Sequence, residues 1–249
     1  MTAKSINEVI ETLEQIIQSS KTEENPLGYF AALYYKVTIS VKDKLGENYF
    51  KDDQRMEQLD VIFANRYLSA YKKHMEGIPT TKSWESAFKS SKNQNLIVLQ
   101  HLLLGMNAHI NLDLGIAAAE ISTKSTISEL HSDFNKINEL LASLLVEVQN
   151  DLAKIWPMLF VILKFLKKTD DLIANFSMNL ARDGAWKFAN ELVNEEMKNR
   201  DDMIANRDEK IFNISKLITD QGIVTRIVCR LIRWGEKGTP SDKIKILET

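Results

Sequence analysis

Two histidines and one aspartate recur at multiples of four residues within the most apolar long segment of the sequence. They are His101, His109 and Asp113. In an α-helix, side chains four residues apart lie on one face. Neutral imidazole and carboxylate groups are ordinary zinc ligands, and an imidazole held by a carboxylate can act as a general base toward water. The spacing therefore indicates two possible chemistries. One is a site for a single divalent metal such as zinc, with all three residues as ligands. The other is a catalytic pair formed by His109 and Asp113.

These side chains are expected to lie on a helix that is buried on every side. The helix should run from about residue 95 to residue 121, and apolar residues occur all around it. Burying a neutral polar group without a partner costs roughly 2–7 kcal/mol. The polar side chains must therefore pair with one another, bind something or face a wet cavity. Gly105, between the two histidines, leaves room for a ligand or for a side chain from a facing helix.

The same residues also allow a purely structural interpretation. A histidine and an aspartate one turn apart often form a hydrogen-bonded pair that only fixes helix packing. Asn107 and Asn111 are candidates for binding a ligand, but on another side of the helix they are also suited to contacts with neighbouring helices. Polar and apolar residues alternate over residues 107–114, as they do in a strand. A lone strand in a helical chain would have no partner, so we expect a helix.

Three polar residues from other parts of the chain are expected to converge on this segment. Arg66, Asp133 and Arg182 are candidates for ligand binding, together with His101 and the two asparagines. The structural alternative for Arg182 is an ion pair with Asp183 or Glu191. For Asp133 it is a favourable interaction with the N-terminus of its own helix.

Composition limits the class of protein. Of 249 residues, 44% are hydrophobic and 27% are charged, as in ordinary soluble globular proteins. A net charge of −2 gives no reason to expect nucleic-acid binding. The single cysteine, Cys229, excludes an internal disulfide and fits a cytoplasmic protein. The apolar run from Ile155 to Leu166 contains Lys164 and is too short to span a bilayer. We expect it to be a buried helix, and we expect no stable membrane insertion.

The elements that must position the candidate site are helices. Nine glycines and four prolines give few turn or strand signals, and apolar residues repeat at helical spacing through most of the chain. We expect a single all-α domain over residues 1–249, in which several helices pack around the buried central one. Residues 1–24 and 236–249 should be peripheral. The tail after Gly235 should be loose apart from Ile244 and Leu247. The oligomeric state stays open.

Several short strings resemble a family of uncharacterised, mainly bacterial proteins of unknown function. The strings are FANRYL, SWESAF, HLLLGMNAHINLDL, DFNKIN and ARDGAW, which fall between Phe63 and Leu192. The most specific is G-M-N-A-H-I-N-x-D-L at Gly105 to Leu114. This resemblance implies an all-α fold and no particular activity.

A second resemblance concerns the metal hypothesis. Gly105, His109 and Asp113 are similar to the G-x3-H-x3-D segment of the zinc-dependent phospholipase C and single-strand nuclease superfamily. This resemblance implies that His109 and Asp113 ligate zinc. That superfamily has a further histidine soon after the aspartate, whereas Ile116 to Ala119 contain none. A one-metal site with His101 as third ligand is still compatible with the sequence.

Two functional hypotheses follow. In the first, a buried polar pocket around His101, His109 and Asp113 binds a small molecule or a metal, and any reaction there is hydrolysis. In the second, the protein is a non-enzymatic structural or interaction protein whose polar residues only fix helix packing. A cavity beside His109 is the feature that separates them.

Overall fold

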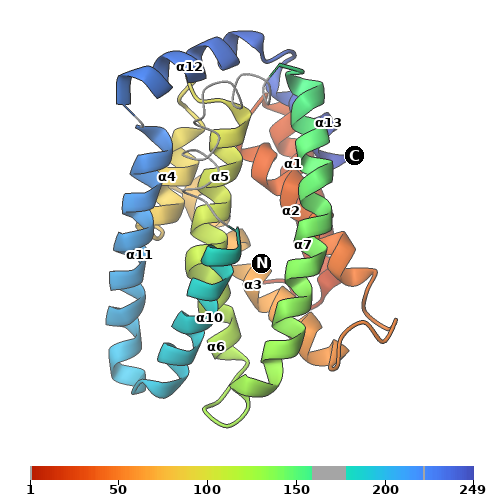
Figure 1. Cartoon of the computed structure of the whole chain (residues 1–249), viewed down its shortest axis with the longest axis vertical. Coiled ribbons are helices and arrows are strands. Elements are labelled where there is room, and N and C mark those ends of the chain that lie inside the picture. The colour runs from red at the N-terminus through yellow and green to blue at the C-terminus, as the bar shows by residue number, and fades with distance from the viewer. Residues whose placement is uncertain (1, 159–177, 221) are drawn as a thin grey trace.

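The chain folds into a bundle of helices. The computed structural model describes residues 2–158, 178–220 and 222–249, and every regular element in these ranges is helical (Figure 1). The all-α fold predicted from the sequence is therefore confirmed. The elements are α1 (Ile6–Thr22), α2 (Leu27–Lys42), α3 (Asp53–Met75), α4 (Lys82–Ser90), α5 (Val98–Ala108), the π-helical turn η1 (His109–Asp113), α6 (Leu114–Glu120), α7 (Ile127–Ile155), α10 (Met178–Asn194), α11 (Met197–Thr219), α12 (Gly222–Gly235) and α13 (Pro240–Glu248).

The predicted central helix lies in the middle of this bundle. It consists of α5, η1 and α6 and runs without a break from Val98 to Glu120. Helix α5 packs against α2, α4 and α11, whereas α6 packs against α3 and α10. The segment is long and apolar enough to cross a membrane, but 89% of its most apolar window is buried inside the protein. Its apolar character is thus explained by neighbouring helices on all sides.

Helix boundaries follow local signals in the sequence. The Ser5 hydroxyl accepts a hydrogen bond from the Glu8 amide at 3.3 Å and begins α1. The Asp52 carboxylate accepts one from the Arg55 amide at 2.9 Å and begins α3. Helix α7 ends at Ile155, because Trp156 precedes a proline and adopts an extended conformation. The buried helix expected from Ile155 to Leu166 lies, from residue 159 on, outside the described residues.

The expectation of a loose C-terminal tail is wrong. Pro240–Glu248 forms α13, which packs against α1, α2 and α7. Thr239 caps its first turn, and Ile244 and Leu247 are fully buried. The Lys243 ammonium is also buried and lies 3.0 Å from the Glu236 carboxylate. The cap, the two apolar side chains and this ion pair together attach the tail to the bundle.

Candidate functional site

A π-helical turn interrupts the central helix at the two residues predicted to be catalytic. It comprises His109–Asp113, and the Leu114 amide donates to the carbonyl of His109, five residues earlier. Short π-helical turns are rare and occur frequently at functional sites, because they disturb the regular hydrogen bonding of the helix. The Arg207 Nε donates to the Asn111 carbonyl within this turn at 3.0 Å. The strand interpretation of residues 107–114 is thus wrong, and the helical one is correct except for this turn.

Asp113 is the centre of a buried polar network. Its side chain is 1% exposed, and its Oδ1 accepts a hydrogen bond from Arg66 Nε at 2.8 Å. Its Oδ2 accepts one from Trp84 Nε1 at 2.7 Å and lies 3.3 Å from His109 Nδ1. Burial alone would raise the pKa of Asp113, but the hydrogen bond to His109 and the charge of Arg66 outweigh it and keep the pKa below its usual value. Asp113 is therefore an ionised carboxylate with three donors.

His109 is held in one orientation and one protonation state. Its ring stacks on Phe63, with ring centroids 3.6 Å apart and planes 5° from parallel. Burial lowers the pKa of His109 in spite of the opposing attraction of Asp113, so the imidazole is neutral at neutral pH. Because Nδ1 faces the ionised carboxylate, the single ring proton belongs on Nδ1. Nε2 then carries a lone pair, and it is buried without a hydrogen-bond partner among the described residues.

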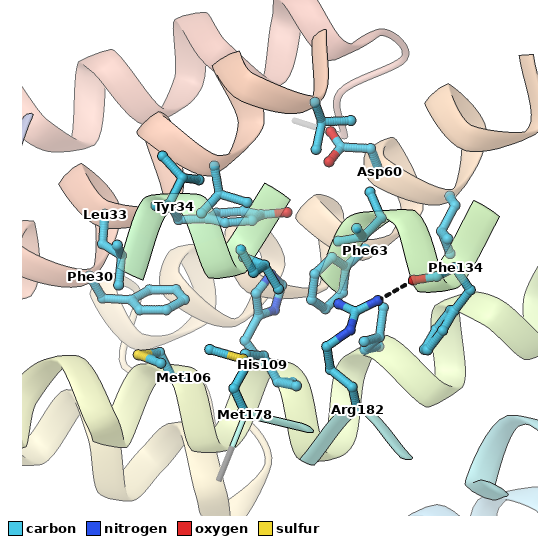
Figure 2. A pocket seen from close by; sticks show the side chains of 18 of the residues that line it. Phe30, Leu33, Tyr34, Asp60, Phe63, Met106, His109, Phe134, Met178 and Arg182 are labelled. Carbon is cyan, nitrogen blue, oxygen red and sulfur yellow. Dashed lines mark hydrogen bonds between the residues drawn. The ribbon is translucent and has the colours of Figure 1, made fainter. Parts of the chain in front are cut away.

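An apolar cavity of about 110 Å³ lies beside His109 (Figure 2). Helices α2, α3 and α7 form its wall together with the central helix and α10, mostly through aliphatic and aromatic side chains. Nine buried side-chain atoms have no hydrogen-bond partner among the described residues, and four of them belong to residues that line this cavity. These four atoms are Tyr34 Oη, Asp60 Oδ2, His109 Nε2 and Arg182 Nε. The Thr38 hydroxyl donates to the backbone carbonyl of Tyr34 at 2.9 Å.

Two of these residues carry ionisable groups of opposite sign. Asp60 is 6% exposed, and burial, together with the nearby Glu57, raises the pKa of its carboxyl to about 7. Arg182 is 2% exposed and donates to the Phe134 carbonyl at 2.6 Å, with its guanidinium carbon 4.6 Å from the centre of the Phe134 ring. Burial lowers the pKa of Arg182 to about 9. The expected ion pair with Asp183 or Glu191 is absent, since no described carboxylate lies within 4.0 Å of the guanidinium nitrogens.

The two asparagines connect the central helix to α11. Asn107 Nδ2 donates to the Ile211 carbonyl and to Ser215 Oγ, both at 3.0 Å. Asn111 Nδ2 donates to Asn107 Oδ1 at 3.0 Å. Neither residue lines the cavity. Both amides have protein partners, as the helix-contact interpretation expects.

Asp133 also has a structural role. It is fully buried, and its two carboxylate oxygens accept hydrogen bonds from the backbone amides of Lys51 and Asp52, at 2.9 and 3.1 Å. It therefore fixes the loop that leads into α3 rather than the start of its own helix. Like the asparagines, it is outside the cavity lining.

His101 is separated from His109 by an aromatic side chain. Phe30 of α2 fills the space above Gly105, where an added Cβ would come within 2.4 Å of the Phe30 ring. His101 itself packs edge-on against Tyr29, at 5.7 Å between ring centroids. In the part of the chain that the structure describes, no group of three His, Cys, Asp or Glu side chains could hold a metal ion. The proposed ligand set of His101, His109 and Asp113 is therefore not assembled.

Sequence reasoning missed two residues that line the cavity and the donor role of a third. Tyr34 and Asp60 contribute polar atoms without described partners, and the indole of Trp84 donates to Asp113. Asp60 had a readable signal. Met56, Asp60 and Phe63 are four and three residues apart, so they lie on one face of a helix. Asp60 is therefore a single carboxylate among apolar side chains. Tyr34 sits in a continuous apolar run and gave no such signal.

Comparisons with known proteins agree with the first resemblance and give no support to the second. No curated protein and no solved structure matches the chain. A model of a family of unknown function (DUF5995) matches residues 6–221. This match spans all the elements that form the candidate site, and the chain belongs to the DUF5995 family.

Proposed function

We propose that the protein binds a small, mainly apolar molecule in the cavity beside His109. One observation carries this proposal: four buried polar atoms without described partners belong to residues that line a single apolar cavity. A buried donor or acceptor without a partner costs about 1–3 kcal/mol. Ligand pockets typically combine an apolar lining with a few polar groups that orient the ligand. A ligand would supply the missing hydrogen bonds and fill the hollow.

The four atoms define what this ligand must offer. His109 Nε2 is an acceptor and can take a hydrogen bond from a ligand hydroxyl or amide N–H, or from a water bound beside a ligand that has no donor. Arg182 Nε is a donor, whereas the groups of Tyr34 and Asp60 can donate or accept, depending on the protonation of the carboxyl. An apolar cavity of about 150 Å³ accepts benzene. At about 110 Å³, this cavity is smaller and favours a short aliphatic chain over an aromatic ring.

The experiment that tests this proposal measures the binding of phenol and 1-hexanol by calorimetry and by the shift in Tm. Wild-type protein should bind at least one of them, and the Tm should rise with ligand concentration. Tyr34→Phe should weaken binding by about tenfold, because it removes one hydrogen-bonding group from the cavity.

Tyr67→Phe is the matched control. The Tyr67 hydroxyl is also buried without a described partner, but this residue does not line the cavity. Its removal should leave binding unchanged. If neither probe binds, or if the two variants behave alike, the proposal is wrong and the interpretation as a packing network gains support.

Hydrolysis is a second candidate, favoured by the paired Asp113 and His109. An imidazole that a carboxylate orients and whose Nε2 has no described partner can take a proton from a water in the cavity that His109 lines. Small p-nitrophenyl esters provide the assay. Turnover above the buffer rate that disappears in His109→Gln would support hydrolysis. Ester binding without such turnover would leave ligand binding as the function.

A further inference from the structure

Arg182 differs from the other buried charged residues in its surroundings. Lys243 pairs with Glu236 at 3.0 Å, and Asp151 pairs with Lys36 at 2.7 Å. Asp208 accepts hydrogen bonds from the backbone amides of Lys82 and Ser83 and from the Ser83 hydroxyl. Each of these charges has an opposite charge or several donors.

In contrast, the described groups that Arg182 contacts are neutral, and the charge of Asp183 acts on it only from beyond ion-pair distance. The neutral groups are the Phe134 carbonyl and the Phe134 ring, and Nε has no described partner. Figure 2 shows the guanidinium of Arg182 between Phe63 and Phe134, in the wall of the cavity. A buried charge is retained at low cost only when it is paired and hydrogen-bonded. An anionic group in the cavity would meet that requirement.

Asp60, the acidic residue in the wall of this cavity, can avoid an unpaired buried charge in another way. A buried carboxyl can take up a proton and become neutral, and burial already raises the pKa of Asp60 to about 7. The guanidinium of Arg182 stays protonated at neutral pH, even with its pKa lowered to about 9. At neutral pH, an anion beside Arg182 would therefore stabilise the site more than a cation beside Asp60.

We propose that the ligand is a small monocarboxylic acid with an apolar body, bound with its carboxylate on Arg182. This inference rests on the proposed function and specifies its ligand class. Among the described residues of the lining, Arg182 is the only arginine or lysine, so one negative charge is balanced and a second, as in a phosphate or a dicarboxylate, is not. The apolar body would lie against Phe63, Ile110 and Leu114, which line the same cavity.

The test compares hexanoate with hexanamide and hexylamine, which share a chain and differ in the charge of the head group. Calorimetry at pH 7.5 should show hexanoate binding at least about tenfold more tightly than hexanamide, because hydrogen bonds to charged groups are the stronger ones. In Arg182→Met, hexanoate affinity should fall by about tenfold or more, while hexanamide affinity should change little.

Two further variants keep the result interpretable. Arg55→Met is the control, since Arg55 pairs with Glu129 and does not line the cavity; hexanoate affinity should be unchanged. Arg182→Lys retains the charge and should keep the preference for the acid if the methionine variant does not fold.

The outcomes separate the two proposals. If hexanamide or 1-hexanol binds but hexanoate binds no more tightly, the carboxylic-acid inference is wrong and ligand binding stands. The same holds if hexylamine binds most tightly, which would assign the head group to Asp60. If no compound of the series binds, both proposals are wrong.

Discussion

Replacing Asp60 by asparagine should stabilise the protein increasingly as the pH rises. The carboxyl of Asp60 is buried, and its Oδ2 has no described partner. Burial raises its pKa from the ordinary 3.8 to about 7. Between these two values the folded protein holds a proton that the unfolded chain has released, so the free energy of unfolding falls as the pH increases. An asparagine of the same shape has no proton to lose and escapes this penalty.

The size of the effect follows from the difference between the two pKa values. About three pKa units at 1.36 kcal/mol each correspond to roughly 4 kcal/mol over the whole titration. Because part of that change lies below pH 5, about 2.5 kcal/mol of it falls between pH 5 and pH 8. The stability of Asp60→Asn relative to wild type should therefore increase by about 2.5 kcal/mol over this range.

Urea unfolding of both proteins at pH 5, 6, 7 and 8 measures this difference, and the subtraction cancels the titration of all other groups. Asp208→Asn is the control, because Asp208 is equally buried but accepts three hydrogen bonds. This second variant should be less stable than wild type. A difference between Asp60→Asn and wild type that stays constant with pH, or a variant that is less stable at pH 8, would refute the reasoning.

Three other predictions concern the central helix. Gly105→Ala should destabilise the protein by about 1–3 kcal/mol, because the new Cβ overlaps Phe30; urea unfolding measures it, and an unchanged midpoint would contradict the close packing. Asp113→Asn should cost about 1–3 kcal/mol, because the amide weakens the hydrogen bonds with Arg66, Trp84 and His109, and an unchanged stability would contradict the network. Burial lowers the pKa of His109, so nitrogen NMR at pH 7.5 should show a neutral ring protonated on Nδ1, and a charged ring would contradict this assignment.

The parts of the fold and site that the sequence predicted depend on local spacing. The buried central helix follows from its apolar periodicity, and the contact of His109 with Asp113 follows from their four-residue separation. The sequence also predicted that Gly105 leaves space for a ligand or a side chain from a facing helix, and the Phe30 ring occupies this space. The helical C-terminal tail was readable too, because Thr239 caps a turn that begins with proline, but this signal was overlooked.

The parts that were missed depend on how helices pack against one another. Tyr34 and Asp60, which the sequence analysis did not select, come from α2 and α3, and only the tertiary arrangement brings them to the cavity that Arg182 of α10 also lines. His101 lies on the same helix as His109, but the ring of Phe30 from another helix separates them. The π-helical turn could not be derived either, since a contact such as that of Arg207 with a carbonyl of the turn is non-local.

The π-helical turn also limits how the length of this chain can change. It accommodates about one residue more than an α-helical turn, and each residue rotates a helix by about 100°. Removing one residue from His109–Asp113 would therefore restore a regular α-helix and leave α6 in nearly the same rotation. Gly115 of α6 packs so closely on α10 that an added Cβ would lie 2.8 Å from the Ala185 carbonyl. A single-residue deletion within the turn should therefore keep this contact, whereas a deletion elsewhere in the central helix would rotate Gly115 away from α10 by about 100°.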